Sequence, residues 1–241
     1  MTRLAILSDI HGNLLALEAV IADAEARGCT AFANLGDSLS GPLWPAETAD
    51  LLIARRWPTI AGNHERQLQT LGERMGPSDR FTASRLSDAH RDWLRGLPPT
   101  LAIDDMLLVH GTPASDVDHL VETVDAEGIR PAKDIEIAAR LDGTHARFTF
   151  AGHSHLPQLR RLSDGRTVAN PGSVGLQAFD DDRPHPHVVE TGDPRARYAI
   201  REGNTVTPVA VDYDHRAASA RAARAGFAGW ATWLATGRFA G

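Results

Sequence analysis

The chain has 241 residues, of which 42% are hydrophobic and 23% charged, and this composition excludes a disordered or low-complexity protein. The formal net charge of −6 predicts no general attraction to nucleic acid or to an anionic membrane, so we expect neither a stable nucleic-acid complex nor a membrane partner. The single cysteine, Cys29, excludes an internal disulfide framework and favours a reducing compartment.

The first half of the chain alternates short apolar runs with helical patterns, which is typical of a layered α/β fold. In chain order the sequence predicts a strand at 4–7, a helix at 14–24, a strand at 31–35, a helix at 47–55, a strand at 58–61 and a helix at 86–94. Gly28 lies where the end of the first helix is expected.

The second half is richer in strands, which are predicted at 101–103, 106–109, 147–151, 158–162, 167–169, 198–201 and 206–211. Tight turns are expected at Asp104-Asp105, Asp164-Gly165 and Gly203-Asn204. The last predicted elements are helices at 215–225 and 230–235. Two stretches, 112–131 and 180–195, are expected to be long loops, and either a functional lid or plain disorder fits them.

Polar residues directly follow five of the predicted strands. The five segments are Asp9-Ile10-His11-Gly12-Asn13, Gly36-Asp37, Gly62-Asn63-His64-Glu65, His110-Gly111 and Gly152-His153-Ser154-His155. Ligands of open α/β sheets bind at the carboxyl ends of strands, so these side chains are expected at one edge. Two histidines two residues apart on an extended segment also point the same way.

In this order the five segments resemble the blocks of the calcineurin-like metallophosphoesterase superfamily, which run Asp-x-His, Gly-Asp, Gly-Asn-His-Asp/Glu, His and Gly-His-x-His. The run from Asn170 to Gly175 further resembles a block of its small bacterial and archaeal phosphodiesterase branch. The resemblance implies a four-layer αββα sandwich, in which helices flank two mixed β-sheets and the metal site lies at the strand ends. We expect one such domain over residues 1–241, with a C-terminal helical extension at about 214–241.

The resemblance also implies two divalent cations per chain, bridged by Asp37. A carboxylate suits a bridge between cations roughly 3.5–4 Å apart because it has two oxygens to share. The other implied ligands are Asp9, His11 and His155 for the first cation, and Asn63, His110 and His153 for the second. This mixed oxygen and imidazole set favours Mn²⁺, with Fe and Zn²⁺ as alternatives, over Mg²⁺ or Ca²⁺.

By the same resemblance the reaction is hydrolysis of a small phosphodiester or phosphomonoester, nucleotides included, by a hydroxide that bridges the two cations. Asn63 and His64 are expected to contact the phosphate, and His64 to act as general acid. A supporting histidine at a helix N-terminus is the alternative for His64. Asn13 and Asn170 are expected to support the ligands through hydrogen bonds, and an ordinary turn role is their alternative.

Two positions depart from the protein Ser/Thr phosphatases of the superfamily, which carry Gly-Asp-x-x-Asp-Arg-Gly. Ser40 replaces the aspartate that supports the histidine, and Gly41 replaces the arginine that binds phosphate. This weakens the alternative of a dinucleoside polyphosphate or protein Ser/Thr phosphatase. A catalytically inactive scaffold of the same fold is the other alternative, and the complete ligand set with His64 argues against it.

The remaining histidines match no ligand position and are interpreted as ordinary residues, with His185 and His187 solvated in the loop 180–195. The C-terminal apolar residues are interpreted as core packing, with a contact between two copies of the chain as the alternative. These residues are Trp230, Trp233, Leu234 and Phe239. Trp44 is also expected in the core, and lining the substrate cleft is its alternative.

The N-terminal apolar run from Leu4 to Leu7 is cut short by Ser8 and Asp9, so it predicts a buried strand rather than a signal peptide. No apolar run approaches the length that a membrane span requires. We therefore expect a cytoplasmic enzyme whose partner is a small phosphorylated substrate, and the substrate itself carries no recognisable motif.

Overall fold

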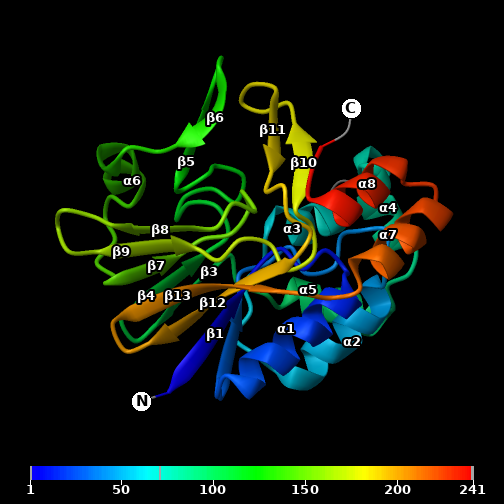
Figure 1. The fold of residues 1–241 in the computed structure, drawn as a ribbon, viewed down its shortest axis with the longest axis horizontal. Coiled ribbons are helices and arrows are strands. Elements are labelled where there is room, and N and C mark those ends of the chain that lie inside the picture. The colour runs from blue at the N-terminus through cyan, green and yellow to red at the C-terminus, as the bar shows by residue number, and fades with distance from the viewer. Residues whose placement is uncertain (1, 71, 240–241) are drawn as a thin grey trace.

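Two mixed β-sheets form the centre of the computed structural model, which describes residues 2–70 and 72–239 (Figure 1). The first sheet has the strand order β13-β12-β1-β2, with β1 and β2 parallel. The second has the order β3-β4-β7-β9-β8, with β4, β7 and β9 parallel. The bounds are β1 (Arg3–Leu7), β2 (Ala31–Asn34), β3 (Thr100–Ile103), β4 (Met106–Val109), β7 (Phe148–Phe150), β8 (Gln158–Arg161), β9 (Thr167–Asn170), β12 (Ala196–Glu202) and β13 (Thr205–Val211).

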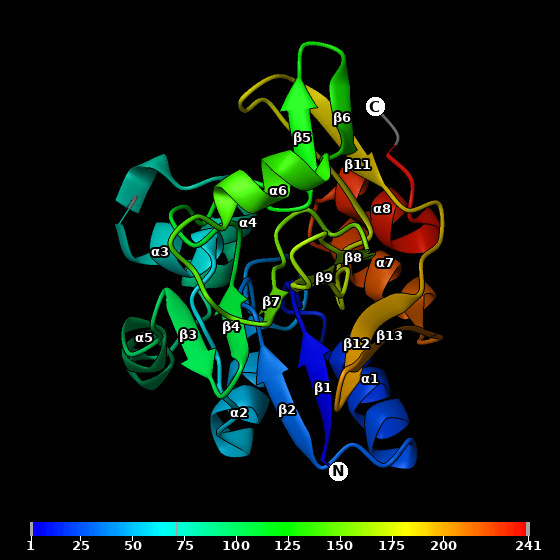
Figure 2. The same ribbon diagram turned by 90° about the vertical axis from the view of Figure 1, so that its left-hand side faces the viewer.

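Helices cover the outer faces of both sheets and complete four layers, which confirms the αββα fold (Figures 1 and 2). On the first sheet, Leu7 packs with Val20 and Leu52 of the covering helices, and on the second sheet Val168 packs with Ile137. The helices are α1 (Leu14–Ala26), α2 (Pro45–Arg55) and α5 (Asp88–Arg95) on the first sheet, and α6 (Asp134–Arg140) on the second.

The apolar run of β1 is uninterrupted because both faces of the strand are buried. Successive side chains of a strand point to opposite faces, so Leu7 meets the helices while Ile6 meets the other sheet. Ile6 packs there with Leu108 and Phe150 in the layer between the two sheets. The strand thus ends at Leu7 with its backbone fixed from both sides, two residues before Asp9.

The predicted strand at 58–61 is wrong. The segment runs beside β2, but it forms only an isolated bridge between Asn34 and Thr59. Pro58 has no N–H to donate to a ladder, so only its carbonyl oxygen and the N–H of Ile60 bond to Asn34. The other predicted strands of the two sheets are confirmed to within two residues at each end.

Both predicted long loops contain hairpins, so the loop predictions for 112–131 and 180–195 are wrong. The hairpin strands are β5 (Glu122–Asp125), β6 (Gly128–Pro131), β10 (Ala178–Asp181) and β11 (His187–Glu190). The two hairpins project from the sheets side by side, with β6 in contact with β11 (Figures 1 and 2). Each of these strands is only four residues long, so its alternation of buried and exposed side chains is too short to distinguish it from a loop. In β11, for example, only His187 and Val189 are buried.

Three short polar elements were also not predicted, namely α3 (Asn63–Thr70), η1 (Gly72–Arg74) and α4 (Pro77–Ala83). In α3, Leu68 is the only aliphatic residue, so the segment has no apolar periodicity to read. α3 begins within the third ligand segment, at Asn63, and η1 and α4 follow it along the chain.

The two predicted C-terminal helices are present as α7 (His215–Arg224) and α8 (Ala228–Thr236). α7 contacts α1, and α8 contacts β10, as the orange and red helices of Figure 1 show. Met1, Leu71, Ala240 and Gly241 of the expected domain and extension lie outside the described residues. In the described part of the chain, no helix has both the length and the apolar character of a membrane span.

Candidate metal centre

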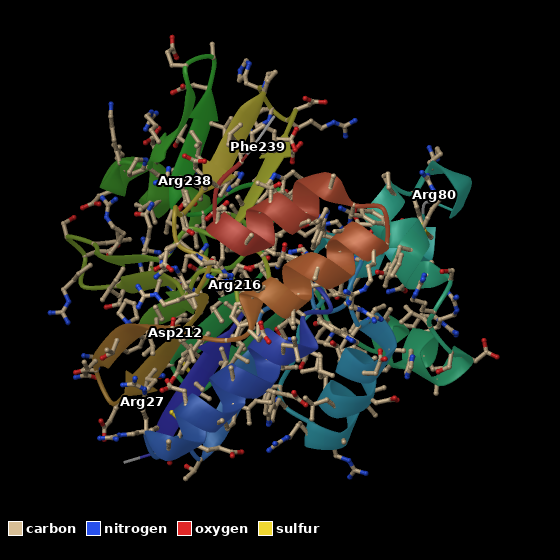
Figure 3. The ribbon with its side chains drawn as sticks, turned by 45° about the vertical axis from the view of Figure 1, so that its right-hand side comes forward. Arg27, Arg80, Asp212, Arg216, Arg238 and Phe239 are labelled. Carbon is tan, nitrogen blue, oxygen red and sulfur yellow. The ribbon has the colours of Figure 1, made fainter. Side chains whose placement is uncertain are left out.

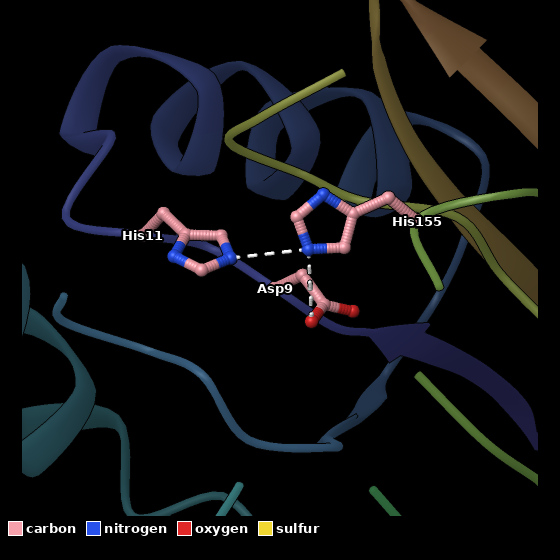
Figure 4. Close-up of side chains that lie close together, drawn as sticks. All are labelled: Asp9, His11 and His155. Carbon is pink, nitrogen blue, oxygen red and sulfur yellow. Dashed lines mark hydrogen bonds and ion pairs between the residues drawn. The ribbon is translucent and has the colours of Figure 1, made fainter. Parts of the chain in front are cut away.

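The first group of predicted ligands is brought together where β1 and β7 end. Asp9 and His11 follow β1, and His155 approaches from the segment after β7 (Figure 4). One ligand atom from each lies within 4.8 Å of the other two. The Nε2 atoms of His11 and His155 are 3.1 Å apart, and Nε2 of His155 is 3.3 Å from Oδ1 of Asp9. Three donor atoms thus converge on one point.

The second group forms around Asp37, which follows β2. Its ligand atoms and those of His110 and His153 also lie within 4.8 Å of one another. Nε2 of His110 is 3.1 Å from Oδ2 of Asp37 and 3.1 Å from Oδ1 of Asn63. Nε2 of His110 is also 3.9 Å from Oδ1 of Asp9, so the two groups adjoin. No predicted ligand is more than 8% exposed.

The backbone is held in an uncommon conformation at the ligands. Of the seven non-glycine residues with positive φ in the described chain, five are predicted ligands. Their φ angles are 54° at Asp9, 52° at His11, 51° at Asp37, 67° at His153 and 57° at His155. Such residues cost of order 1–3 kcal/mol each and persist where surrounding structure holds them, typically at functional sites.

Each of the four imidazoles donates its outer N–H to a backbone carbonyl. The contacts are His11 Nδ1 to Ser40 at 2.7 Å, His110 Nδ1 to Leu35 at 2.8 Å, His155 Nδ1 to Leu176 at 2.7 Å and His153 Nε2 to Val117 at 3.0 Å. A carbonyl accepts only an N–H, so in a neutral ring this bond fixes the tautomer and leaves the other nitrogen with its lone pair toward the centre. This support comes from the main chain and therefore leaves no trace in the sequence.

The electrostatics of the cluster prepare two of its four imidazoles for a cation. Burial, reinforced by neighbouring histidines, lowers the pKa of His11 to about 3 and that of His153 to about 4, so both are neutral ligands. Burial acts against charge on His110 too, but the Asp37 carboxylate outweighs it and raises the pKa of His110 to about 10. A cation that binds His110 must therefore displace its proton.

Asn13 and Asn170 tie the ligand loops together. Asn13 donates to the Gly175 carbonyl at 2.9 Å and caps α1, and Asn170 donates to the Gly152 carbonyl at 2.7 Å. In the described chain neither amide is hydrogen-bonded to a ligand side chain. Their support acts on the backbone of the loops rather than on the imidazoles.

Glu65 has a role that the sequence analysis did not assign. Its fully buried carboxylate accepts hydrogen bonds from the backbone N–H groups of Asp37, Ser38 and Gly62, at 2.7, 2.8 and 2.8 Å. It therefore joins the segment after β2 to the segment that carries Asn63. A Cβ at Gly62 would overlap Oδ1 of Asp37, so a glycine is required at this junction.

His64 lies beside the cluster and is held by an aspartate from an unexpected element. Its Nδ1 is 2.8 Å from Oδ1 of Asp79, which is 3% exposed and belongs to α4. Ser40, which replaces the histidine-supporting aspartate of the protein Ser/Thr phosphatases, donates a hydrogen bond to the same Asp79 oxygen. Burial disfavours charge on His64, but Asp37 and Asp79 outweigh it and raise the pKa of His64 to about 9. The other ring nitrogen of His64, Nε2, takes no part in the contact with Asp79.

The position of Gly41 excludes a larger residue. A Cβ there would overlap the carbonyl oxygen of His11 and come within 3.1 Å of the Trp230 ring. An arginine is therefore impossible at this point without moving the loop that carries a ligand.

A cavity of about 400 Å³ opens onto the two groups of ligands. Its walls include Gln67 of α3, Phe179 and Asp181 of β10, and Trp230 and Trp233 of α8. Both tryptophans also pack, as expected, against the buried cluster that includes Leu43 and Leu234, and Leu234 is fully buried. What the sequence did not predict is that their exposed edges line the cavity. A larger cavity of about 580 Å³ lies where the strands of the two sheets begin, and none of the ligands lines it.

The other histidines divide into two kinds. His119 and His187 are buried, so the interpretation of His187 as a solvated loop residue is wrong. The ring of His119 lies 4.9 Å from that of His153 and 5.6 Å from that of His187, between centroids. His185 is exposed, as expected. Trp44 does not line the cavity but packs near the C-terminal helices, with the guanidinium of Arg221 4.7 Å from its ring centroid.

The fold and the paired groups of metal-binding residues define a class of metal-dependent hydrolases. Residues 2–193 match the model of the calcineurin-like phosphoesterase superfamily domain, so the chain belongs to this superfamily and is a hydrolase of phosphate esters. This confirms the resemblance seen in the sequence. No curated protein sequence matches the chain.

Two solved structures share the fold over the whole chain. A metallophosphoesterase from Sphaerobacter thermophilus is 26% identical, with a TM-score of 0.77, and the alignment covers 98% of this chain and 99% of that one. A hypothetical protein from Pyrococcus horikoshii OT3 is 19% identical, with a TM-score of 0.76 and all of both chains covered, and shows the fold alone. The chain is thus similar to these proteins from end to end.

Proposed function

We propose that the protein is a dinuclear metal-dependent phosphoesterase that hydrolyses a small phosphodiester or phosphomonoester in the cytoplasm. The observation that carries this proposal is the pair of adjoining, buried groups of ligand atoms around Asp9 and Asp37. Their mixed oxygen and imidazole donors suit Mn²⁺, Fe and Zn²⁺ better than Mg²⁺ or Ca²⁺, and we take Mn²⁺ as the first candidate with Fe and Zn²⁺ as alternatives. The single cysteine, Cys29, is free and buried, in keeping with a reducing compartment.

When bound, the two cations would activate water and neutralise phosphate charge. The two carboxylates of Asp9 and Asp37 and the amide oxygen of Asn63 supply the oxygen donors, and four oriented imidazoles supply the nitrogen donors. Asn63 and His64 contact the phosphate in this proposal. Asp79 holds Nδ1 of His64, so Nε2 carries the proton that the leaving alkoxide receives.

The alternatives are less well supported. A dinucleoside polyphosphate or protein Ser/Thr phosphatase handles several negative charges, yet Gly41 leaves no space for the arginine that would bind them. An inactive scaffold has no need of five ligand residues with positive φ or of a histidine held by Asp79. A hydrolase that relies on its metals for phosphate recognition fits these observations better.

The test uses protein stripped with a chelator and reloaded separately with Mn²⁺, Fe²⁺, Zn²⁺ or Ca²⁺. Turnover is measured with bis(p-nitrophenyl) phosphate and p-nitrophenyl phosphate. We expect Mn²⁺ to restore turnover and Ca²⁺ to fail, because Ca²⁺ prefers an all-oxygen shell. If no metal stimulates hydrolysis of either ester, the proposal is wrong.

A further inference from the structure

Three buried polar side chains lie together beside the metal centre, and each has one atom without a hydrogen-bond partner in the described chain. The atoms are Nδ1 of His119, Oε2 of Glu122 and Nε2 of His187. The three residues are only 7%, 1% and 6% exposed. Most buried polar atoms of native proteins are hydrogen-bonded, and an exception often marks an ion or a water. These atoms therefore indicate a ligand site.

The three residues come from the two hairpins that lie side by side (Figures 1 and 2). His119 precedes β5, Glu122 is the first residue of β5, and His187 is the first residue of β11. Nδ1 of His119 is 3.8 Å from Oε2 of Glu122. The ring of His187 meets that of His119 edge to face, with 5.6 Å between centroids. The cluster thus spans the junction between the hairpins.

Both imidazoles can offer a lone pair to this junction. Nδ1 of His187 is 2.9 Å from the His185 carbonyl, so in the neutral ring Nδ1 carries the proton and Nε2 the lone pair. No partner holds a proton on Nδ1 of His119, so the neutral ring can carry its proton on Nε2 instead. Neutral imidazole is the form that binds a metal ion.

The carboxylate of Glu122 has no cationic partner. Its Oε1 accepts a hydrogen bond from Gln158 at 2.9 Å, and in the described chain no arginine or lysine forms an ion pair with it. Arg140 donates instead to two backbone carbonyls at the start of the hairpin, at 2.9 and 2.7 Å, and to the Thr123 hydroxyl at 2.7 Å. Burial raises the pKa of Glu122 to about 7, although Ser154, Gln158 and Arg140 favour its charged form.

The nearest cation on β11 lies on the other face of that strand. Successive side chains of a strand point to opposite faces, so Glu190 points away from His187. The Glu190 carboxylate is 3.6 Å from the guanidinium of Arg238, which Figure 3 labels beside this hairpin. Arg238 is therefore paired outside the cluster, and the buried carboxylate faces only the two imidazoles.

Two imidazoles and one carboxylate are a donor set typical of Zn²⁺. Zn²⁺ binds such atoms at about 2.0–2.1 Å, so two of its ligand atoms can be up to about 4.2 Å apart, and one ion can reach both His119 and Glu122. Nε2 of His187 is farther away, because in the described chain only the two groups of the metal centre bring three such atoms within 4.8 Å. An ion here would draw β11 toward β5. A cavity of about 440 Å³, lined by His119 and Glu122, provides a path to it.

We propose that His119, Glu122 and His187 form a third cation site, which takes Zn²⁺ and ties the hairpin β5–β6 to the hairpin β10–β11. The site is separate from the metal centre. The ring of His153 lies 4.9 Å from that of His119, but its outer N–H is bonded to the Val117 carbonyl. The inference goes beyond the proposed function and does not depend on it.

The choice of metal distinguishes this site from the metal centre. Sites of nitrogen and oxygen donors bind Zn²⁺ more tightly than Mn²⁺, and Mn²⁺ suits oxygen-rich sites. Loading with Mn²⁺ followed by dialysis therefore leaves the third site empty, and protein prepared in this way carries two cations. The Glu122 carboxyl of that protein faces no cation, so it keeps its raised pKa.

The experiment compares His187→Gln with His185→Gln in protein that is stripped with a chelator, saturated with Zn²⁺ and dialysed. His185 is exposed on the same hairpin, so its substitution removes an imidazole from outside the cluster. Glu122→Gln is a second variant, since its amide oxygen can still accept from Gln158. Mass spectrometry of the metals gives the Zn²⁺ content per chain, and thermal melts check that each variant folds.

We expect one more Zn²⁺ per chain in the wild type and in His185→Gln than in His187→Gln or Glu122→Gln. The counts are three against two if the metal centre holds both of its cations. Zn²⁺ should also slow amide hydrogen exchange in β11 of the wild type more than in His187→Gln, because the ion fixes this strand to the other hairpin. Turnover of bis(p-nitrophenyl) phosphate by the Mn²⁺-loaded protein should be unchanged in His187→Gln.

The inference is overturned if the wild type and His187→Gln bind the same number of Zn²⁺ ions, or if Glu122→Gln keeps the wild-type count. It is also overturned if His185→Gln loses an ion, because the site would then be a solvated loop. Equal counts with metal-dependent turnover would leave the proposed function intact. A difference of one Zn²⁺ without any turnover would refute the proposed function and support the third site.

Discussion

The ligands of the metal centre and the walls of the cavity above it are built on different parts of the fold. The ligands follow strands of both sheets, and their outer nitrogens and backbone are fixed by main-chain contacts. The walls come from the hairpin β10–β11 and from α8, which contact each other and are more exposed. Rigid elements thus hold the residues proposed for the chemistry, while peripheral elements shape what reaches them.

The largest difference between a ligand and a wall residue is expected at Asp37. In Asp37→Ala both cations lose a shared ligand, so we expect loss of dinuclear binding and a fall in turnover of about a thousandfold or more, as when a catalytic unit is removed. Metal content by mass spectrometry and turnover of the diester are measured together. Trp230→Ala, a change in the wall, serves as the control and should keep two cations per chain. Retention of both cations by Asp37→Ala would show that Asp37 is not the bridge.

A smaller effect is expected at His64, which stands between the two regions. His64→Ala should lower kcat about 10²- to 10⁴-fold, the range of general acid catalysis, with both metals retained. Asp79→Asn should lower kcat about tenfold, because the loss of an orienting partner typically costs 10- to 100-fold.

If Asp79 acts through His64, the double variant should be no slower than His64→Ala. Ser40→Ala is the matched control, since it removes the other donor to Asp79 and leaves the contact of Asp79 with His64. Additive losses in the double variant would mean that Asp79 acts independently, and loss of a metal in His64→Ala would make His64 a ligand.

This division also explains what the sequence could predict. The ligands stand in short contiguous segments after apolar strands, so Asp9, His11 and the pair His153 and His155 could be recognised before their contacts were known. The central strands could be predicted for the same reason, since both faces are buried and their apolar runs are unbroken. Local pattern and tertiary position agree in this part of the chain.

The segments that form the cavity walls and support His64 have no such pattern in the sequence. Asp79 reaches His64 from a short polar helix, and no fixed spacing relates it to Ser40, whose place it takes. β10 and β11 carry exposed acidic residues together with the buried His187, so their composition resembles that of a loop. Trp230 looks apolar whether it meets the core or a cavity. Contacts between distant segments decide these cases, and a single sequence does not display them.

The smallest effect expected is on stability, at Glu122 in the hairpin β5–β6 behind the site. Burial raises the pKa of Glu122 to about 7, so the folded protein favours the protonated carboxyl. The stability that this group contributes is complete below its usual value near 4.5 and is lost as the pH rises to about 7. Above that pH, a charged and buried carboxylate weakens the fold.

Glu122→Gln replaces this carboxyl by a neutral group of the same shape, which can still accept the hydrogen bond that Gln158 donates at 2.9 Å. At about pH 8 the variant should be more stable by about 1–3 kcal/mol, and near pH 4 the two proteins should be equal. Urea unfolding at both pH values measures the difference, with Glu127→Gln, an exposed change in the same hairpin, as the control. A difference that does not grow with pH would contradict the raised pKa. If the stability difference grows with pH while the turnover of Glu122→Gln stays unchanged, the buried carboxyl of this hairpin lowers the stability of the fold without contributing to the chemistry at the strand ends.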